Sequence, residues 1–189
     1  MSGDPLYCYP NSIVLRNKFG ITDFQKLDDL ERKLVTERFR DGAPTGKFDL
    51  KHLRAIHRHL FQDIYDWAGE LRLVEISKAG SSFMFRRYID TGMADVHRRL
   101  TEWKFLCKLS AAEFATKAGE IIGDINHAHP FREGNGRAQM TYLLQLGAQA
   151  GHEIDVTLIK REGWYAGAIA ANSGDYKGLA TLIRQAISA

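Results

Sequence analysis

The segment His129–Arg137 gathers polar side chains of complementary chemistry, and it reads HPFREGNGR. Apolar residues at helical spacing precede and follow it, so we expect one helix to end near Pro130 and another to begin near Asn135. The first turn of a helix presents unpaired N–H groups and roughly half a positive charge, which together bind phosphate. The segment therefore predicts a phosphate site at a helix junction.

The residue types at this junction suit phosphate chemistry. Gly134 and Gly136 carry no side chain that would keep a ligand from the backbone, and Asn135 can cap the helix or donate to a phosphate oxygen. Arg137 in the first turn opposes the helix dipole, a conflict that a bound anion would resolve. His129 has an unperturbed pKa near neutrality and offers a general base. We expect a phosphate cradle beside a proton acceptor.

Glu133 adds a single carboxylate next to the glycine turn. One hard oxygen ligand suits Mg²⁺, which retains waters and takes other ligands from nucleotide phosphates. A zinc site that uses His127, His129 and Glu133 is the alternative. Two histidines at i and i+2 do not share a helical face, which disfavours zinc. We therefore predict Mg²⁺ at Glu133.

The elements that position this segment are mostly helical, because the chain has only four prolines to interrupt them. Asp23 and Asp49 can cap two helices, and the second is expected to end near Gly69. Alternating apolar residues around a Gly-Ser turn predict a short hairpin within 71–85. Further apolar stripes of helical character cover 89–100, 114–125, 143–150, 156–169 and 179–183. The pattern predicts an all-α protein of about seven helices with one short β-hairpin.

Size and composition favour one globular domain over residues 1–189. Apolar residues make up 44% and charged residues 26%, which excludes a disordered or low-complexity chain. The net charge of +3 forms no basic tail or stripe, so we expect no nucleic-acid partner. The competing nucleic-acid interpretation rests on the paired arginines Arg86, Arg87, Arg98 and Arg99.

The chain has no apolar run of roughly 18 residues, so we expect no membrane association. Its start lacks the basic segment and apolar core of a secretory signal. Two distant cysteines suit a reducing compartment. The expected location is the cytoplasm, or a host cell reached by translocation without a classical signal peptide.

The segment His129–Arg137 resembles the signature of the Fic family, His-x-Phe-x-(Asp/Glu)-Gly-Asn-Gly-Arg-x-x-Arg, without a gap. Ile56–Gly69 is similar to a second helix of that family. Tyr9–Ile21 is similar to the bacterial subgroup that a separate small antitoxin inhibits. The resemblance covers roughly Tyr7 to Ile183.

The resemblance implies a Fic fold that transfers AMP from ATP to a hydroxyl of a target protein, as a toxin or secreted effector. It implies that His129 deprotonates the target Ser, Thr or Tyr, that Phe131 anchors the loop, and that Glu133 binds Mg²⁺. It assigns phosphate binding to Gly134, Asn135, Gly136 and Arg137, with Arg137 also stabilising charge during the reaction. The hairpin is implied to be a flap that adds a strand of the target. The flap residues are Ile76, Ser77, Lys78, Ala79, Gly80, Ser81, Ser82 and Phe83.

One residue departs from the signature, because Met140 stands where the second arginine is expected. In relatives that arginine holds the terminal phosphate and pairs with the antitoxin's inhibitory glutamate. Two alternatives therefore stay open. One is another nucleotidyl- or phosphotransferase of the same fold, although the phosphotransferase branch has lysine where this chain has Gly136. The other is a binding module whose turnover is impaired through Met140.

Overall fold

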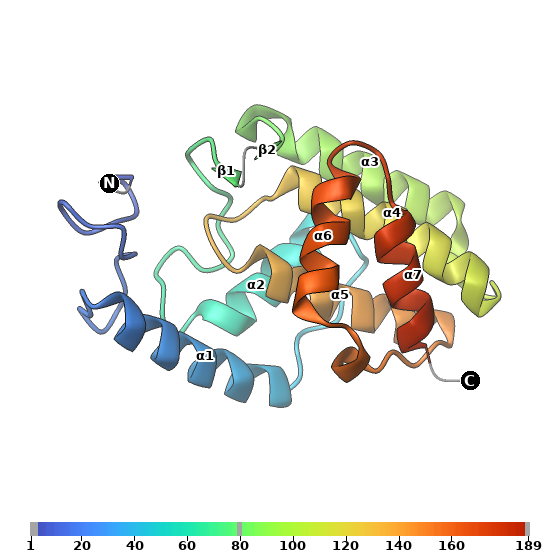
Figure 1. Ribbon diagram of the computed structural model, residues 1–189, viewed down its shortest axis with the longest axis horizontal. Helices are drawn as coiled ribbons and strands as arrows, with labels where there is room; N and C mark the ends of the chain where they lie inside the picture. Colours follow the sequence, from blue (N-terminus) through green and yellow to red (C-terminus); the bar gives the residue numbers. More distant parts are fainter. Residues whose placement is uncertain (1–3, 79–80, 188–189) are drawn as a thin grey trace. The chain divides into compact units, whose positions relative to one another are not determined.

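The computed structural model describes residues 4–78 and 81–187, and the regular secondary structure of this part is helical except for one short hairpin and two isolated bridges. Its seven α-helices confirm the expected fold class (Figure 1). In chain order the elements are α1 (Phe24–Arg40), α2 (Leu50–Phe61), β1 (Ser77–Lys78), β2 (Ser81–Ser82), η1 (Arg86–Tyr88), α3 (Ile89–Glu102), η2 (Lys104–Leu106), α4 (Ala111–Ala128), α5 (Asn135–Ala150), η3 (Val156–Leu158), α6 (Arg161–Ala171) and α7 (Lys177–Ala186).

Contacts divide the chain into two compact units. One comprises Met1–Pro44 and Arg54–Glu70, and the other comprises Thr45–Leu53 and Leu71–Ala189. The single domain expected over 1–189 stays a prediction. None of the helices in the described part of the chain has the length and apolar character needed to cross a bilayer.

The first unit contains α1 and most of α2. Asp23 caps α1 as expected, since its carboxylate accepts the Lys26 N–H at 2.9 Å. Past α2, the rings of Tyr65 and Trp67 stack with centroids 4.4 Å apart, and the Tyr65 hydroxyl donates to the buried Glu31. These contacts give the unit a core of its own.

The second helix is shorter than its apolar pattern predicted. It ends at Phe61, whereas Ile64 continues the apolar stripe and led to an expected end near Gly69. The chain instead turns back, and the Gly69 N–H donates to His57 Nδ1 at 2.9 Å. Trp67 also stacks on His57. Ile64 is therefore a buried residue of the turn that follows the helix rather than of the helix itself.

The second unit is organised around α4, which contacts α3, α5, α6 and α7. Its sequence explains this position, because small and branched apolar residues cover most of its surface and ten of its eighteen residues are buried. Gly119 permits the closest approach, since a Cβ there would lie 2.9 Å from the Ala180 nitrogen on α7. Figure 1 shows α6 and α7 side by side, joined by a short loop.

The hairpin is confirmed but is much shorter than the alternating run suggested. Only β1 and β2 pair, with Ser77 opposite Ser82 and Lys78 opposite Ser81. The expected strand character of residues 71–76 is wrong, because they are irregular. Ala79 and Gly80 lie outside the described residues. The stretch expected as one helix from Val156 to Ile169 is also divided, into η3 and α6.

Candidate functional site: the loop between α4 and α5

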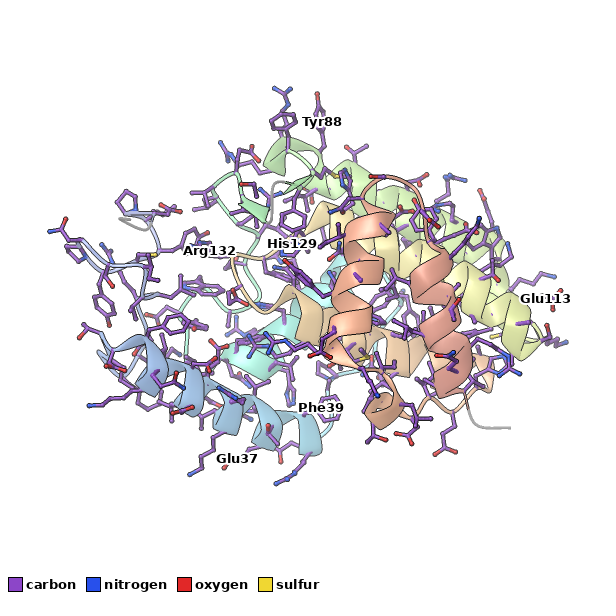
Figure 2. The ribbon with its side chains drawn as sticks, in the orientation of Figure 1. Glu37, Phe39, Tyr88, Glu113, His129 and Arg132 are labelled. Carbon is purple, nitrogen blue, oxygen red and sulfur yellow. The ribbon has the colours of Figure 1, made fainter. Side chains whose placement is uncertain are left out.

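The segment singled out by its chemistry connects the end of α4 to the start of α5, as expected. α4 ends at Ala128 and α5 begins at Asn135, so His129 follows one helix directly and Asn135 opens the next. Figure 2 labels His129 and Arg132 on the connecting loop. The whole loop belongs to the second compact unit. The structure thus joins the predicted base and the predicted phosphate cradle at one helix–loop–helix junction.

His129 has an unusual backbone and a defined ring orientation. Its φ of 42° and ψ of 60° are left-handed, a conformation that costs a non-glycine residue about 1–2 kcal/mol. The ring Nδ1 lies 3.1 Å from the main-chain oxygen of Asn126. Because a carbonyl only accepts, Nδ1 is the donor, and the neutral imidazole then keeps Nε2 as its acceptor. This is the tautomer a general base requires.

An aromatic ring from the hairpin covers the imidazole. Phe83 stacks on His129 with ring centroids 3.7 Å apart and an interplanar angle of 18°. Phe83 directly follows β2, which the family resemblance implies to be part of a target-positioning flap. The stack fixes the plane of the imidazole and places the hairpin in contact with the expected base.

Asn135 closes the loop between the two helices. Its Oδ1 accepts the Phe131 N–H at 3.0 Å, and its Nδ2 donates to the Phe131 oxygen at 2.8 Å. Phe131 itself is fully buried and anchors the loop in the core. These two bonds use the side-chain oxygen and one of the two Nδ2 N–H donors, so the Asn135 side chain fixes the path of the loop.

The two glycines shape the entrance to α5. Gly134 has a φ of 79°, which favours glycine, and stands at the N-cap. Gly136 is exposed, and a Cβ built there would meet no atom within 4 Å. The missing side chain of Gly136 therefore serves no packing purpose. It leaves open space over N–H groups that have no partner inside the helix.

A carboxylate and a guanidinium flank this open turn. The side chains of Glu133 and Arg137 are 51% and 37% exposed, and Arg137 Nη2 lies 3.6 Å from Glu133 Oε1. The same Glu133 oxygen accepts the Gly134 N–H at 2.9 Å. A ligand at the start of α5 would meet one cation and one anion within reach. Met140, one turn further along α5, is half-buried.

The donor set fits one kind of metal. In the described ranges no group of three or more His, Cys, Asp and Glu side chains is arranged to hold a metal ion. A closed zinc site needs about four such ligands, whereas Mg²⁺ is held by one or two carboxylates and substrate phosphates. His127, a ligand only in the disfavoured zinc alternative, lines an apolar cavity beside the hairpin. Glu133 therefore fits Mg²⁺ better than zinc.

The hairpin is short and lies beside an apolar cavity. Among the described residues, pairing continues past β2 through the Phe83 N–H, which donates to the Ile76 oxygen at 3.4 Å. A two-stranded hairpin keeps unpaired main-chain groups on its outer edges, where a further strand can add. The adjoining cavity measures about 470 Å³ and is lined by Phe83, Met84, Phe85, Tyr88, Thr91, Gly92 and His127.

Two residues of this site were missed by the sequence analysis. The buried Asn126 supplies the oxygen that orients His129, and the fully buried Arg72 bonds to the loop from the root of the hairpin. Asn126 offers no signal in the sequence, because the contact uses its main-chain oxygen, which every residue type has. Arg72 does offer one, since an arginine inside an apolar run has to find polar partners when the run is buried.

Comparison with known proteins identifies close similarity over nearly the whole chain. The model of the Fic/DOC family matches residues 47–146. The probable protein adenylyltransferase y4lH of Sinorhizobium fredii is 38% identical over 185 residues, which cover 97% of this chain and 96% of the relative. The protein adenylyltransferase VbhT of Bartonella schoenbuchensis is 37% identical over 97% of this chain. The match spans only 39% of VbhT.

Solved structures agree with this similarity. BepC of Bartonella tribocorum, a VirB-translocated effector with bound AMPPNP, has a TM-score of 0.87 at 28% identity and matches over 98% of this chain and 97% of its own. The N-terminal Fic domain of a putative cell filamentation protein of Bartonella quintana, with bound ADP, has a TM-score of 0.88 at 32% identity. That match covers 98% and 95% of the two chains.

Proposed function

The chain belongs to the Fic/DOC family, and from this premise we propose that it is a protein adenylyltransferase that moves AMP from ATP to a Ser, Thr or Tyr hydroxyl of a target protein. The observation that carries the proposal is the α4–α5 junction. There an oriented imidazole and an open helix N-terminus are held by one loop that Asn135 closes. The relatives named as protein adenylyltransferases and the neighbours with bound AMPPNP and ADP support it.

The phosphates of ATP would bind at the first turn of α5. We assign phosphate binding to Gly134, Asn135 and Gly136, because main-chain N–H groups at the start of a helix attract anions, and Gly136 leaves the space open. The Gly134 N–H donates to Glu133 in this structure, so it would have to exchange that partner for phosphate. Arg137, in the same turn, supplies a fixed positive charge for the oxygens that become more negative as the reaction proceeds. The nucleotide would thus be held mainly by the backbone.

His129 would act as the general base. As the target hydroxyl oxygen bonds to the α-phosphorus, its proton passes to His129 Nε2, and the bond from the α-phosphorus to the leaving oxygen breaks. The products are the AMP ester of the target and pyrophosphate. The Nδ1 donor to Asn126 supports this role, because it leaves Nε2 as the acceptor and stabilises the imidazolium that forms.

Glu133 would hold Mg²⁺ through its carboxylate, which suits an ion that shares its remaining positions between water and phosphate. When bound, Mg²⁺ neutralises phosphate charge. Arg137, 3.6 Å from Glu133, would keep that carboxylate beside the cradle. Transfer that persists in excess EDTA would contradict this assignment.

The hairpin would dock the target as an additional strand. Its outer edge offers main-chain groups, and Phe83 lies against His129, so a strand added there brings its side chains next to the base. We assign Ile76 to Phe83 to this role. The cavity beside the hairpin could receive an apolar side chain of the same target segment.

We infer the regulation and the cellular location of this chain from similar proteins. Similarity of Tyr9–Ile21 to the antitoxin-regulated subgroup supports inhibition by a separate small protein, but Met140 removes the arginine that pairs with the inhibitory glutamate in such relatives. We expect this inhibitor to bind more weakly than it does to a chain with arginine. BepC is a translocated effector, which supports export as an alternative to action in the producing cell's cytoplasm.

The test uses purified chain, Mg²⁺, and cell lysate as the source of acceptor proteins. Incubation with α-³²P-ATP should label protein, and incubation with γ-³²P-ATP should not. Mass spectrometry should find AMP on Ser, Thr or Tyr. Label from the γ position alone would establish the phosphotransferase alternative, and AMPPNP binding without label from either position would establish the impaired binding module.

A further inference from the structure

Arg72 is a charged side chain that the proposed chemistry does not use. It lies between α2 and β1, and its side chain is fully buried. A buried guanidinium persists only when hydrogen bonds replace the water it has lost. Its one carboxylate partner, Glu75 at 3.1 Å, is half exposed, so most of the compensation comes from main-chain oxygens.

One set of these oxygens belongs to the loop that carries the proposed base. Arg72 Nε donates to the His129 oxygen at 2.8 Å, and Nη2 reaches the Ala128 oxygen at 3.5 Å. The Arg72 main-chain N–H donates to the Pro130 oxygen at 2.8 Å. The last carbonyls of a helix lack partners within the helix. Here Arg72 supplies a partner for the last carbonyl of α4, that of Ala128, and for the carbonyl of His129, which caps the helix.

The other set belongs to both limbs of the hairpin. Nη1 donates to the Val74 oxygen at 2.7 Å before β1, and Nη2 donates to the Met84 oxygen after β2. The Met84 N–H in turn donates to the His127 oxygen at 2.9 Å. The Glu75 carboxylate also accepts the Arg86 N–H, which keeps the pKa of Glu75 below its usual value. One planar side chain therefore joins the hairpin root to the end of α4.

The backbone of His129 shows why such a clamp matters. A left-handed histidine persists only where its surroundings fix it from several sides. Arg72 bonds to the carbonyl before the strained residue and to the carbonyl of that residue. The contact is therefore placed where it can set the direction of the imidazole.

We propose that Arg72 is a positioning residue. It fixes the position of the strained turn at His129 relative to the root of the docking hairpin. Arg72 does not touch substrate. Its five donors let it bridge both segments at once, which a point charge such as lysine cannot reproduce. This inference rests on the proposed function for its catalytic consequence, but the clamp itself can be tested without any activity.

The first experiment measures the clamp directly. Wild type, Arg72→Lys and Arg72→Met are compared with Arg99→Met, which removes an arginine that packs α3 on α4 away from the loop. Hydrogen exchange is followed in peptides covering 71–85 and 126–131. ¹⁵N spectra of the histidine rings are recorded, with His129 assigned by its loss in His129→Gln.

In Arg72→Met we expect exchange to rise at least tenfold in both peptides, and we expect His129 to lose the signature of an Nδ1 donor. Arg72→Lys should lie between Arg72→Met and wild type, and Arg99→Met should leave both peptides and the ring unchanged. Unchanged exchange and an unchanged ring in the Arg72 variants would overturn the proposal. Should Arg72→Met not fold, the Lys variant decides, because it keeps the buried charge.

The second experiment measures the consequence. At saturating ATP, AMP transfer to lysate protein should fall at least tenfold in Arg72→Met and less in Arg72→Lys, while the Kd for AMPPNP changes less than threefold. Equal losses of rate in Arg72→Met and Arg99→Met would show that Arg72 only stabilises the fold. If wild type transfers no AMP, the proposed function fails, whereas the exchange and ring spectra still decide whether Arg72 sets the loop.

Discussion

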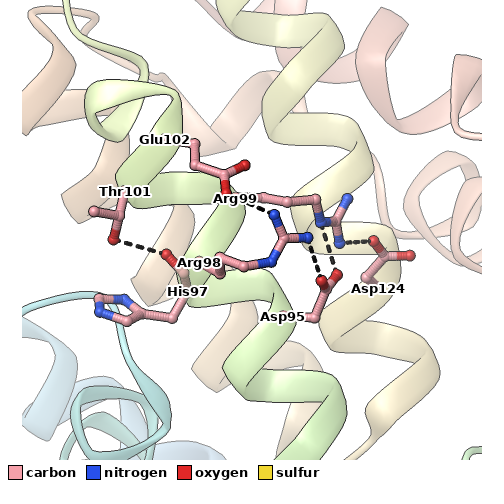
Figure 3. A network of polar contacts seen from close by, with 7 residues as sticks. All are labelled: Asp95, His97, Arg98, Arg99, Thr101, Glu102 and Asp124. Atoms are coloured by element: carbon pink, nitrogen blue, oxygen red, sulfur yellow. Dashed lines mark hydrogen bonds and ion pairs between the residues drawn. The ribbon is translucent and has the colours of Figure 1, made fainter.

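Two arginines of the second unit, Arg72 and Arg99, both join segments that are distant in sequence, yet their partners differ. Arg99 pairs with carboxylates, namely Asp95 on its own helix at 3.0 Å and Asp124 on α4 (Figure 3). Arg72 bonds mainly to main-chain oxygens of irregular segments. Side-chain pairs hold whole helices together, whereas bonds to carbonyls fix the local path of the backbone. The comparison separates a contact that stabilises the fold from one that shapes a site.

The α3–α4 network also bears on the nucleic-acid alternative. Arg98 donates to Asp95 at 2.5 Å and to Glu102 at 2.7 Å, so both arginines of this pair are matched by carboxylates (Figure 3). A surface that attracts phosphate needs an excess of positive charge. Charge at this face of α3 is largely balanced, which favours a structural role for the pair.

The largest effect is expected at the loop, from His129→Ala. Loss of a general base lowers the rate of AMP transfer by roughly 10²- to 10⁴-fold, while thermal unfolding should change little because the ring is only half-buried. Rates are measured with α-³²P-ATP, and Arg99→Met serves as the variant altered outside the loop. A wild-type rate of AMP transfer in His129→Ala would show that His129 is not the general base.

The next largest effect is expected from Asp124→Ala, which should lower the free energy of unfolding without changing the AMP-transfer rate. Asp124 accepts from Arg99 and, at 2.6 Å, from the Tyr176 hydroxyl, so Asp124→Ala leaves two donors unmatched. Because the site is partly exposed, we expect a loss of about 1–2 kcal/mol in unfolding free energy. Urea unfolding measures it, and the more exposed Asp95→Ala should cost less. A change in the AMP-transfer rate per folded molecule would contradict the prediction that this contact affects stability alone.

Gly136→Ala should separate stability from binding at the loop. Its Cβ would meet no atom within 4 Å, so alanine should stabilise α5 by up to about 1 kcal/mol, yet the methyl group should weaken AMPPNP binding several-fold. Gly151→Ala is the control, since Gly151 also faces open space but has a φ of 88°. That variant should lose stability and keep AMPPNP affinity. Unchanged affinity in Gly136→Ala would argue that phosphates bind elsewhere.

The smallest effect concerns alkaline pH. Burial, together with the bond to Asp124, raises the pKa of Tyr176 from 10.0 to about 12. A raised folded pKa contributes stability that is present below pH 10 and lost as pH rises toward 12. The stability difference between wild type and Tyr176→Phe should therefore be constant to pH 9 and shrink by pH 11. Urea unfolding across this range checks it, and a constant difference would contradict the pKa.

Much of this arrangement could be predicted because the decisive residues are contiguous. His129 to Arg137 fall at a helix junction whose two ends are visible in apolar periodicity and in Pro130. Periodicity failed where the chain turns back, as at Ile64, because a buried residue after a helix has the same pattern as a residue within it. The sequence analysis therefore located the loop correctly but overestimated the length of α2.

The parts that could not be predicted depend on contacts between distant residues. The hairpin is short because the Val74 and Met84 oxygens bond to Arg72 instead of extending the ladder. Arg72 and His129 are far apart in sequence, and no local pattern links them. The Phe83–His129 stack likewise exists only once the hairpin lies against the end of α4.

The bonds of Asn135 to Phe131 also affect the chemical ageing of the protein. Asparagine followed by glycine is the pair most prone to deamidation, in which the glycine nitrogen attacks the side-chain carbonyl and yields aspartate or isoaspartate. In the folded chain that carbonyl accepts the Phe131 N–H, and helical geometry fixes the glycine nitrogen. Folding thus protects the motif from its own reactivity, and molecules left unfolded for long periods would refold with a damaged loop.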